Sequence, residues 1–221
     1  MSPFLTLVAR DLKLAVRQGG ALGTALGFYM LVVTLLPLGL GADLNLLSRI
    51  AAGVLWIALL LSALLSLPRV FASDYEDGSL DLLATGPLPL ELVAAAKALA
   101  HWISTSIPLA LLAPVLGILL NLEIGAYAIL VASMLVGTPA VSFIGAVGAA
   151  LTLRAHRGGL LIALLVLPLY VPTLIFGIAS ISGLLGPDGV TSPFLILTAI
   201  SLAAVVLGPF AAAAALRVQM Q

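Results

Sequence analysis

The chain is dominated by long apolar runs that are separated by short polar segments. An uncharged run of about 18 residues or more predicts a spanning helix, because crossing the hydrocarbon core takes about 20 residues of α-helix. Barrel strands are disfavoured, since they alternate over only about ten residues. The pattern therefore predicts an all-α, polytopic membrane bundle of six transmembrane helices. The runs lie at positions 20–40, 50–67, 98–120, 125–153, 158–183 and 193–216.

The runs 125–153 and 158–183 are longer than one span requires. Tilting of the helix would absorb the excess length, and so would a break in the helix. Proline disrupts hydrogen bonding in a helix interior, so a break is favoured at 137–139 or 168–172. No linker or second domain is visible, and residues 1–221 are expected to form a single transmembrane domain.

Composition supports a membrane location and narrows the chemistry. Hydrophobic residues make up 62 % of the 221 positions, whereas soluble domains are roughly 45–50 % apolar. The first run is longer than a signal-peptide core of about 7–15 residues, so it is expected to remain as an anchor. The absence of cysteine excludes disulfides, thiolate metal sites and covalent haem attachment through a C-x-x-C-H motif. We expect no metal and no covalently bound cofactor.

Basic residues predict the orientation, because Lys and Arg in short flanking segments are retained in the cytoplasm. Only Arg49 falls on the other side of the predicted spans. Both termini are therefore expected to be cytoplasmic. The basic residues on the predicted cytoplasmic side are Arg10, Lys13, Arg17, Arg69, Lys97, Arg154, Arg157 and Arg217.

The segment before the first run, residues 1–19, is amphipathic. Apolar side chains repeat at helical spacing on one face, and cations share another face, as in helices that lie in the membrane interface. Two interpretations stay open: an anchor that enforces topology, or a mechanical elbow beside the cytoplasmic loops. The apolar positions are Phe4, Val8, Leu12 and Ala15, and the cations are Arg10, Lys13 and Arg17.

Three glycines, Gly19, Gly23 and Gly27, are spaced four apart where the first spanning helix begins. This spacing places bare backbone positions on one face and predicts close packing against another helix. That helix belongs either to the same chain or to another subunit. A similar small-residue patch occurs at Gly145 and Gly148 in the fourth run.

The central portions of the predicted spans contain no Asp, Glu, Lys, Arg or His. A self-energised secondary transporter is therefore disfavoured, because such carriers usually place an ionisable group near the midplane. The chain also lacks the G-x-x-x-x-G-K-[ST] motif, since Lys13 follows Leu12 and Lys97 follows Ala96. We expect no catalytic residue and no nucleic-acid partner, and any ATP must be hydrolysed by a partner subunit.

Two histidines are weak candidates for haem ligation. His101 precedes Trp102 near the predicted cytoplasmic end of the third span, and His156 lies between Arg154 and Arg157. A histidine beside a tryptophan is more often part of the interfacial belt, and one between arginines is more often a solvated loop residue. We predict that neither histidine is an essential axial ligand.

The longest predicted cytoplasmic connection contains five of the nine acids, all between positions 74 and 91. Ser73 to Glu76 matches a capping box, Gly78 indicates a turn, and Pro89 indicates a helix restart. Such an element suits a partner's groove, with leucines as anchors and carboxylates facing the partner's cations. A solubilising loop explains the acids equally well. The candidate contacts within loop 73–91 are Asp74, Glu76, Asp77, Gly78, Ser79, Leu80, Asp81, Leu82, Leu83, Pro87 and Pro89.

The run DGSLDLLATGPLPLELVAAAKALAHW, residues 77–102, resembles the corresponding loop of the CcmB family, where D-G-S-L-E-x-L…P-L-P-L recurs. Further matches include VTLLPLGLG in the first span, LVGTPAVSFIGAVGAALT in the fourth and PFAAAAALR near the end. Together they cover nearly the whole chain. Asp81 stands where the family pattern usually has Glu, which keeps the charge and shortens its reach.

The resemblance implies a type-2-like ABC permease of a haem exporter in the bacterial inner membrane, acting in cytochrome c maturation. The implied partners are a CcmA-like ATPase, CcmC-like and CcmD-like membrane proteins, and two copies of this or a related permease per ATPase dimer. Haem is the implied substrate, ATP is hydrolysed by the partner, and loop 73–91 is the implied coupling helix. Two alternatives stay open: a structural or regulatory subunit through which no haem passes, or an ABC permease for another substrate.

Overall fold

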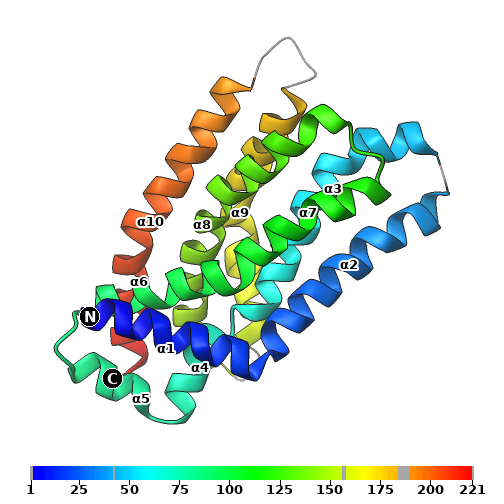
Figure 1. Ribbon diagram of the computed structural model, residues 1–221. Helices are drawn as coiled ribbons and strands as arrows, with labels where there is room; N and C mark the ends of the chain where they lie inside the picture. The colour runs from blue at the N-terminus through cyan, green and yellow to red at the C-terminus, as the bar shows by residue number, and fades with distance from the viewer. Residues whose placement is uncertain (1, 42, 156–157, 184–189, 221) are drawn as a thin grey trace.

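The computed structural model describes residues 2–41, 43–155, 158–183 and 190–220, and the regular structure within them is helical (Figure 1). In this part of the chain, six helices are long and apolar enough to span a membrane, which confirms the predicted bundle. The spans are Gly20–Leu40, Leu44–Glu76, Leu90–Leu119, Ile124–Leu151, Gly159–Ser182 and Thr191–Gln219. The elements are α1 (Pro3–Gln18), α2 (Gly20–Leu40), α3 (Leu44–Ser66), α4 (Arg69–Glu76), α5 (Ser79–Thr85), α6 (Leu90–His101), η1 (Trp102–Ser106), α7 (Ile107–Leu119), η2 (Ile124–Ala126), α8 (Tyr127–Leu151), α9 (Gly158–Ser182) and α10 (Thr191–Gln219).

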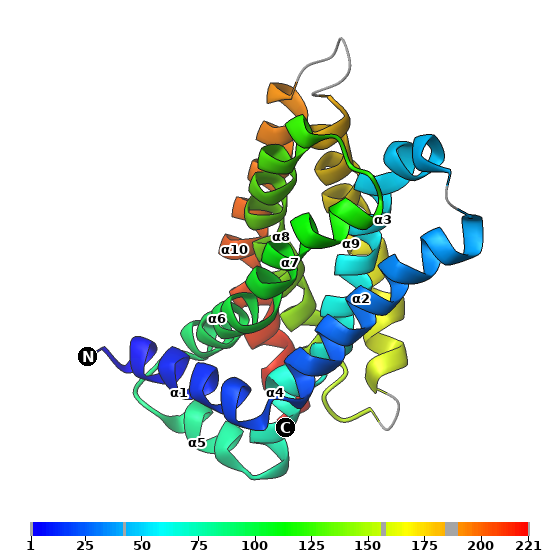
Figure 2. The ribbon, with the colours of Figure 1, turned by 45° about the vertical axis from the view of Figure 1, so that its right-hand side comes forward.

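Both chain ends lie at the same end of the bundle, as an even number of spans requires (Figure 1). Helix α1 lies across this end, and α2 leads away from it along the bundle (Figure 2). Ser2 caps α1 by accepting a hydrogen bond from the Leu5 N–H, and Gly19 ends α1 with φ +54°. The amphipathic helix predicted for residues 1–19 is thus present, and its buried Leu7 and Val8 form part of the core.

Helix α8 lies among the other spanning helices and contacts α3, α6, α7, α9 and α10. Small residues allow this close packing. A Cβ on Gly145 would lie 2.4 Å from a methyl carbon of Leu67, and one on Gly148 would lie 2.2 Å from a methyl carbon of Val166. The small-residue patch of the fourth run therefore packs helices together within this chain.

Of the two ways left open to absorb the excess length of the fourth and fifth spans, a break does not occur, because α8 and α9 continue through their prolines. The irregular segment lies in the third span instead, where α6 passes through the π-helical segment η1 into α7. Single π-turns inside α-helices are frequently found at functional sites. The polar side chains around η1 are described below.

The glycine stripe of the first span does not pack within this chain. Gly19 ends α1 in a left-handed conformation, which a glycine adopts without strain. Gly23 and Gly27 are exposed, and a Cβ on either would meet no atom within 4 Å. The within-chain interpretation is therefore wrong, and contact with another subunit stays a prediction.

Candidate functional site

The segment between the second and third spans forms a helical hairpin, α4–α5, at the end of the bundle that carries α1 (Figure 2). Gly78 turns the chain between the two helices with φ +76°, which confirms the expected turn. The expected restart is confirmed too, because α6 begins at Leu90 directly after Pro89. The capping box is wrong: α4 begins at Arg69, and Ser73 lies within that helix.

Four exposed residues of the hairpin form what we call the acidic tip: Glu76, Asp77, Asp81 and Leu82. Leu82 is 74 % exposed and lies next to Asp81 in the sequence. Hydrogen bonds from Ser79, through its side chain and its backbone N–H, lower the pKa of the Asp77 carboxyl. An exposed leucine with neighbouring carboxylates suits a partner surface that combines an apolar hollow with Lys or Arg.

Other candidate contact residues lie inside the chain. Leu80 is only 1 % exposed and belongs to the core, and Asp74 is buried as well. These two side chains are therefore unavailable to a partner in this structure. Leu83 is half-buried. The remaining candidates are the half-buried Ser79 and the exposed Gly78, Pro87 and Pro89.

Asp74 belongs to a network of four charges that joins three helices; we call it the ion network. Its carboxylate pairs with Lys97 of α6 and, at 2.7 Å, with Nη2 of Arg10 in α1. Asp11 of α1 completes the network, 3.1 Å from Lys97 Nζ and 2.8 Å from Arg10 Nη2. Lys97 is 3 % exposed, and its ammonium lies 5.9 Å from the centroid of the Phe71 ring.

The ion network is balanced, with two cations and two carboxylates. Buried charges are retained where they are paired, because an unpaired buried charge is strongly destabilising. The network therefore holds α1, α4 and α6 as one unit at the end of the bundle. Sequence reasoning missed it, since Lys97 was assigned only to topology and Asp11 received no role.

A cavity of about 110 Å³ is lined by residues of α1, α2, α3, α4, α6 and η1. Sites for drug-sized ligands have about 300–1,000 Å³, so this cavity has room for water or a small ionic group. Its lining includes members of the ion network and residues that lie deeper in the bundle. Among the polar residues that line it are Asp11, Arg69, Asp74, Lys97, His101 and Thr105.

His101 is buried, which corrects its expected place in the interfacial belt. Its Nε2 lies 2.7 Å from the Ser66 hydroxyl of α3, and its Nδ1 lies 3.0 Å from the Ser142 hydroxyl of α8. The Ser106 hydroxyl lies 3.0 Å from Ser142 and extends the cluster. Both ring nitrogens are therefore engaged, and neither is free to ligate iron in this conformation.

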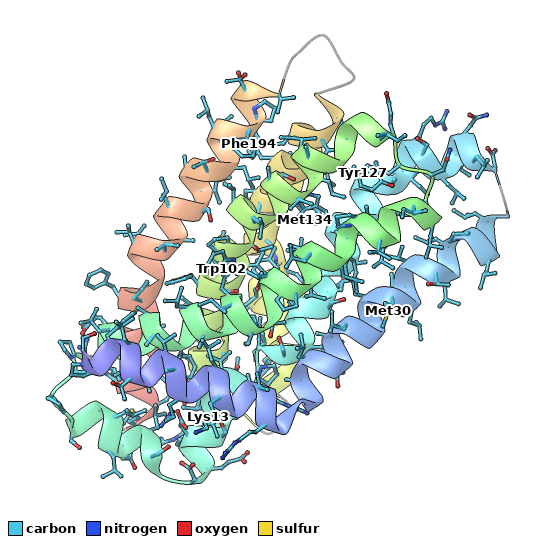
Figure 3. All side chains as sticks on the ribbon, in the orientation of Figure 1. Lys13, Met30, Trp102, Tyr127, Met134 and Phe194 are labelled. Atoms are coloured by element: carbon cyan, nitrogen blue, oxygen red, sulfur yellow. The ribbon has the colours of Figure 1, made fainter. Side chains whose placement is uncertain are left out.

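The same turn of α8 makes hydrogen bonds with three further elements. The indole N–H of Trp102, labelled in Figure 3, donates to the Thr138 hydroxyl at 3.0 Å. The Tyr170 hydroxyl of α9 donates to the Val141 carbonyl at 2.6 Å, and the hydroxyl of Ser201 in α10 accepts from the Ala140 N–H at 3.2 Å. Pro139 lacks an N–H, so one hydrogen bond within α8 is missing at this turn. The turn is bonded to neighbouring helices as well as within α8.

The second candidate histidine, His156, lies outside the described residues. Within the described part of the chain, no group of three or more His, Asp or Glu side chains is placed to hold a metal ion. The acidic tip is exposed, whereas the ion network and the His101 cluster join helices within the chain.

The chain is similar to known proteins over nearly its whole length. The profile of the CcmB protein family matches residues 2–219. Heme exporter protein B of Paracoccus denitrificans is 60 % identical over 216 residues, which cover 97 % of this chain and 99 % of that protein. Heme exporter protein B of Rhodobacter capsulatus is 54 % identical over 217 residues, covering 97 % and 99 %. The Escherichia coli K12 protein of the same name is 41 % identical over 218 residues, covering 99 % of each chain. The chain therefore belongs to the CcmB family.

Proposed function

We propose that this chain is a membrane subunit of a haem exporter in the bacterial inner membrane and acts in cytochrome c biogenesis. Its family and the names of its relatives support haem as the exported or released substrate. Six helices able to span a membrane support a multi-pass, type-2-like ABC permease. CcmC-like and CcmD-like membrane proteins are the proposed partners for haem handling.

The exposed acidic tip is the observation that supports docking of a separate CcmA-like ATPase on this chain. It projects from the α4–α5 hairpin at the end of the bundle where both termini lie. Helix α4 follows α3 after only two residues, and the ion network joins α4 to α1 and α6. A displacement of the hairpin by the ATPase would therefore be passed to the third span and to α1 together.

A pull-down of the ATPase subunit with tagged variants of this chain tests the docking surface. Leu82→Asp is expected to abolish co-purification at normal membrane abundance, because it removes the exposed apolar side chain and adds repulsive charge. Thr85→Asp is the matched control, since it adds the same charge at an exposed position of the same helix without removing apolar area. If the Leu82→Asp variant retains the ATPase at the wild-type level, the docking surface lies elsewhere on the chain.

A second candidate function is a structural or regulatory subunit through which no haem passes. The engagement of both His101 nitrogens by serines favours it, because this buried imidazole offers no free ligand atom. ATP-dependent movement of haem into vesicles that contain the complex supports the exporter. Cytochrome c maturation that consumes ATP without such movement supports the structural role.

A further inference from the structure

We propose that the cavity between α1, α2 and α4 binds the phosphate group of a phospholipid from the leaflet on that side. The proposal goes beyond the export function and concerns the part of the cavity near the α1–α2 junction. Leu14, Ala15, Ala21 and Leu22 form an apolar part of its lining, while Arg69 and Ser73 supply polar groups. The cavity therefore combines the two surfaces that a lipid presents where its headgroup meets its acyl chains.

Charge around the cavity favours an anion. Lys97 lines the cavity but is already paired with both carboxylates that line it, Asp11 and Asp74, and Arg10 balances the second negative charge. Arg69 is the additional cation, and no described carboxylate lies within ion-pair distance of it. The two cations and two carboxylates of the lining balance, and with Arg10, which pairs with both carboxylates from outside the lining, the five charges leave one net positive charge.

The start of α2 adds donors beside Arg69. A Cβ on Gly20 would lie 3.2 Å from Nη1 of Arg69, so the guanidinium lies against the first residue of the helix. No side chain caps this end, its first turn has no acid, and the backbone N–H groups of Gly20 and Ala21 have no partner among the described residues. Free N–H groups and the positive end of the helix dipole favour a phosphate oxygen at this position.

A buried hydroxyl supplies an independent indication of a polar occupant. Thr105 lines the same cavity and is 3 % exposed, and no hydrogen bond joins its hydroxyl to a described residue. The hydroxyl is not among the enclosed side-chain atoms that lack a partner, so it is accessible from the cavity and takes its partner there. A phosphate oxygen, or a water molecule held by one, provides the missing partner.

The location of the cavity selects a lipid over a free anion. α1 lies across the end of the bundle and α2 begins to span directly after Gly19, so their junction lies at the predicted membrane interface. Phospholipid phosphates are concentrated at this depth. The exposed Gly23 and Gly27 continue from Gly20 along one face of α2 and leave space for an acyl chain beside the helix.

The test measures thermal unfolding of the purified full-length chain in detergent while phosphatidylglycerol, phosphatidylcholine or inorganic phosphate is added. Phosphatidylglycerol is expected to raise the unfolding temperature in a saturable manner, because a ligand that binds only the folded state stabilises it. Arg69→Gln is expected to weaken this binding about tenfold, as the loss of charge-assisted hydrogen bonds predicts. Native mass spectrometry of the retained lipid provides a second measurement.

The variant Gly20→Asp distinguishes a loss of lipid binding from a loss of folding stability. An acid in the first turn stabilises a helix through its dipole, so the variant is expected to unfold at a higher temperature without lipid. The new carboxylate lies beside Arg69 and takes the place of the phosphate, so the shift with phosphatidylglycerol is expected to be lost. Retention of the full shift in Gly20→Asp or in Arg69→Gln overturns the proposal.

Lys13→Gln is the matched control, since Lys13 is an exposed cation of α1 that does not line the cavity (Figure 3). An unchanged lipid shift in this variant supports a defined site. A loss equal to that of Arg69→Gln indicates diffuse attraction and overturns the proposal. Inorganic phosphate that binds as tightly as phosphatidylglycerol overturns the assignment to lipid. Binding of phosphatidylcholine with the same dependence on Arg69 supports recognition of the phosphate group.

Discussion

His101 is held between the hydroxyls of Ser66 and Ser142, so its imidazole connects α6 to α3 and α8. His101→Ala removes both bonds, while the Ser66 hydroxyl keeps the Ala63 carbonyl and the Ser142 hydroxyl keeps Ser106 as a partner. We expect a loss of about 1–3 kcal/mol in the free energy of unfolding, measured by thermal unfolding in detergent. Cytochrome c maturation is expected to remain largely intact, because the ring is not a haem ligand. Loss of maturation and of haem absorbance from a normally assembled complex would contradict this prediction.

Leu80 and Leu82 are two positions apart in α5, but Leu80 is buried and Leu82 is exposed. Leu80→Ala is expected to lower the free energy of unfolding by about 2–5 kcal/mol, because it leaves a cavity in the core. Leu82→Ala is expected to change it by less than about 0.5 kcal/mol. Urea or thermal unfolding of the two variants in parallel measures the difference. Equal effects would show that Leu80 is not buried as the structure places it.

Within the helices at the end of the bundle that carries α1, the ion network is expected to act as a single unit. Lys97→Met leaves the carboxylates of Asp74 and Asp11 with Arg10 alone, and we expect a loss of about 3–5 kcal/mol. The double variant Lys97→Met with Asp74→Leu keeps the Arg10–Asp11 pair and is expected to recover part of that loss. A double-mutant cycle by thermal unfolding measures the coupling energy. Additive losses would show that Lys97 and Asp74 do not interact.

Gly145 of α8 packs against a neighbouring helix, whereas Gly23 of α2 lies on an exposed face. Gly145→Ala is expected to destabilise the bundle by about 1–3 kcal/mol, since the new methyl group would overlap Leu67. Gly23→Ala is the matched control on an exposed face, and it is expected to stabilise α2 by roughly 0.5–1 kcal/mol. Thermal unfolding distinguishes the two variants. Destabilisation by Gly23→Ala would reveal a helix packed on that face in the purified assembly.

The elements that could be predicted from the sequence are those with local causes. Run length and apolar character are enough to identify the six spans, and the turn at Gly78 follows from its own neighbours. Burial of Asp74 could not be predicted in this way, because it depends on Arg10, 64 residues away. The pair between Lys97 and Asp11 joins residues 86 apart. A loop that is rich in acids looks solvated until the helices that cover it are placed.

The whole molecule contains no cysteine, so a thiol reagent would label only the position at which a single cysteine is introduced. Asp81→Cys is expected to react with a membrane-impermeant maleimide only when the cytoplasmic side is opened. Glu123→Cys lies in the connection between the third and fourth spans and is expected to react from the opposite side. Ala25→Cys, which is buried, serves as the unreactive control. The reverse pattern for the two exposed positions would invert the predicted orientation.

The π-helical segment Trp102–Ser106 also limits how the length of the third span is able to change. A π-turn contains one residue more than the regular helix around it, so deletion of one residue there would restore continuous α-helical geometry. A π-turn spreads this extra residue over about one turn, so the helices on either side keep their orientation. Deletion there would therefore leave α6 and α7 in register, and His101 and Lys97 would keep their partners, whereas deletion from a regular turn would rotate the rest of the helix by about 100°. Genuine length variants of this family should therefore place a one-residue change of the third span in this segment.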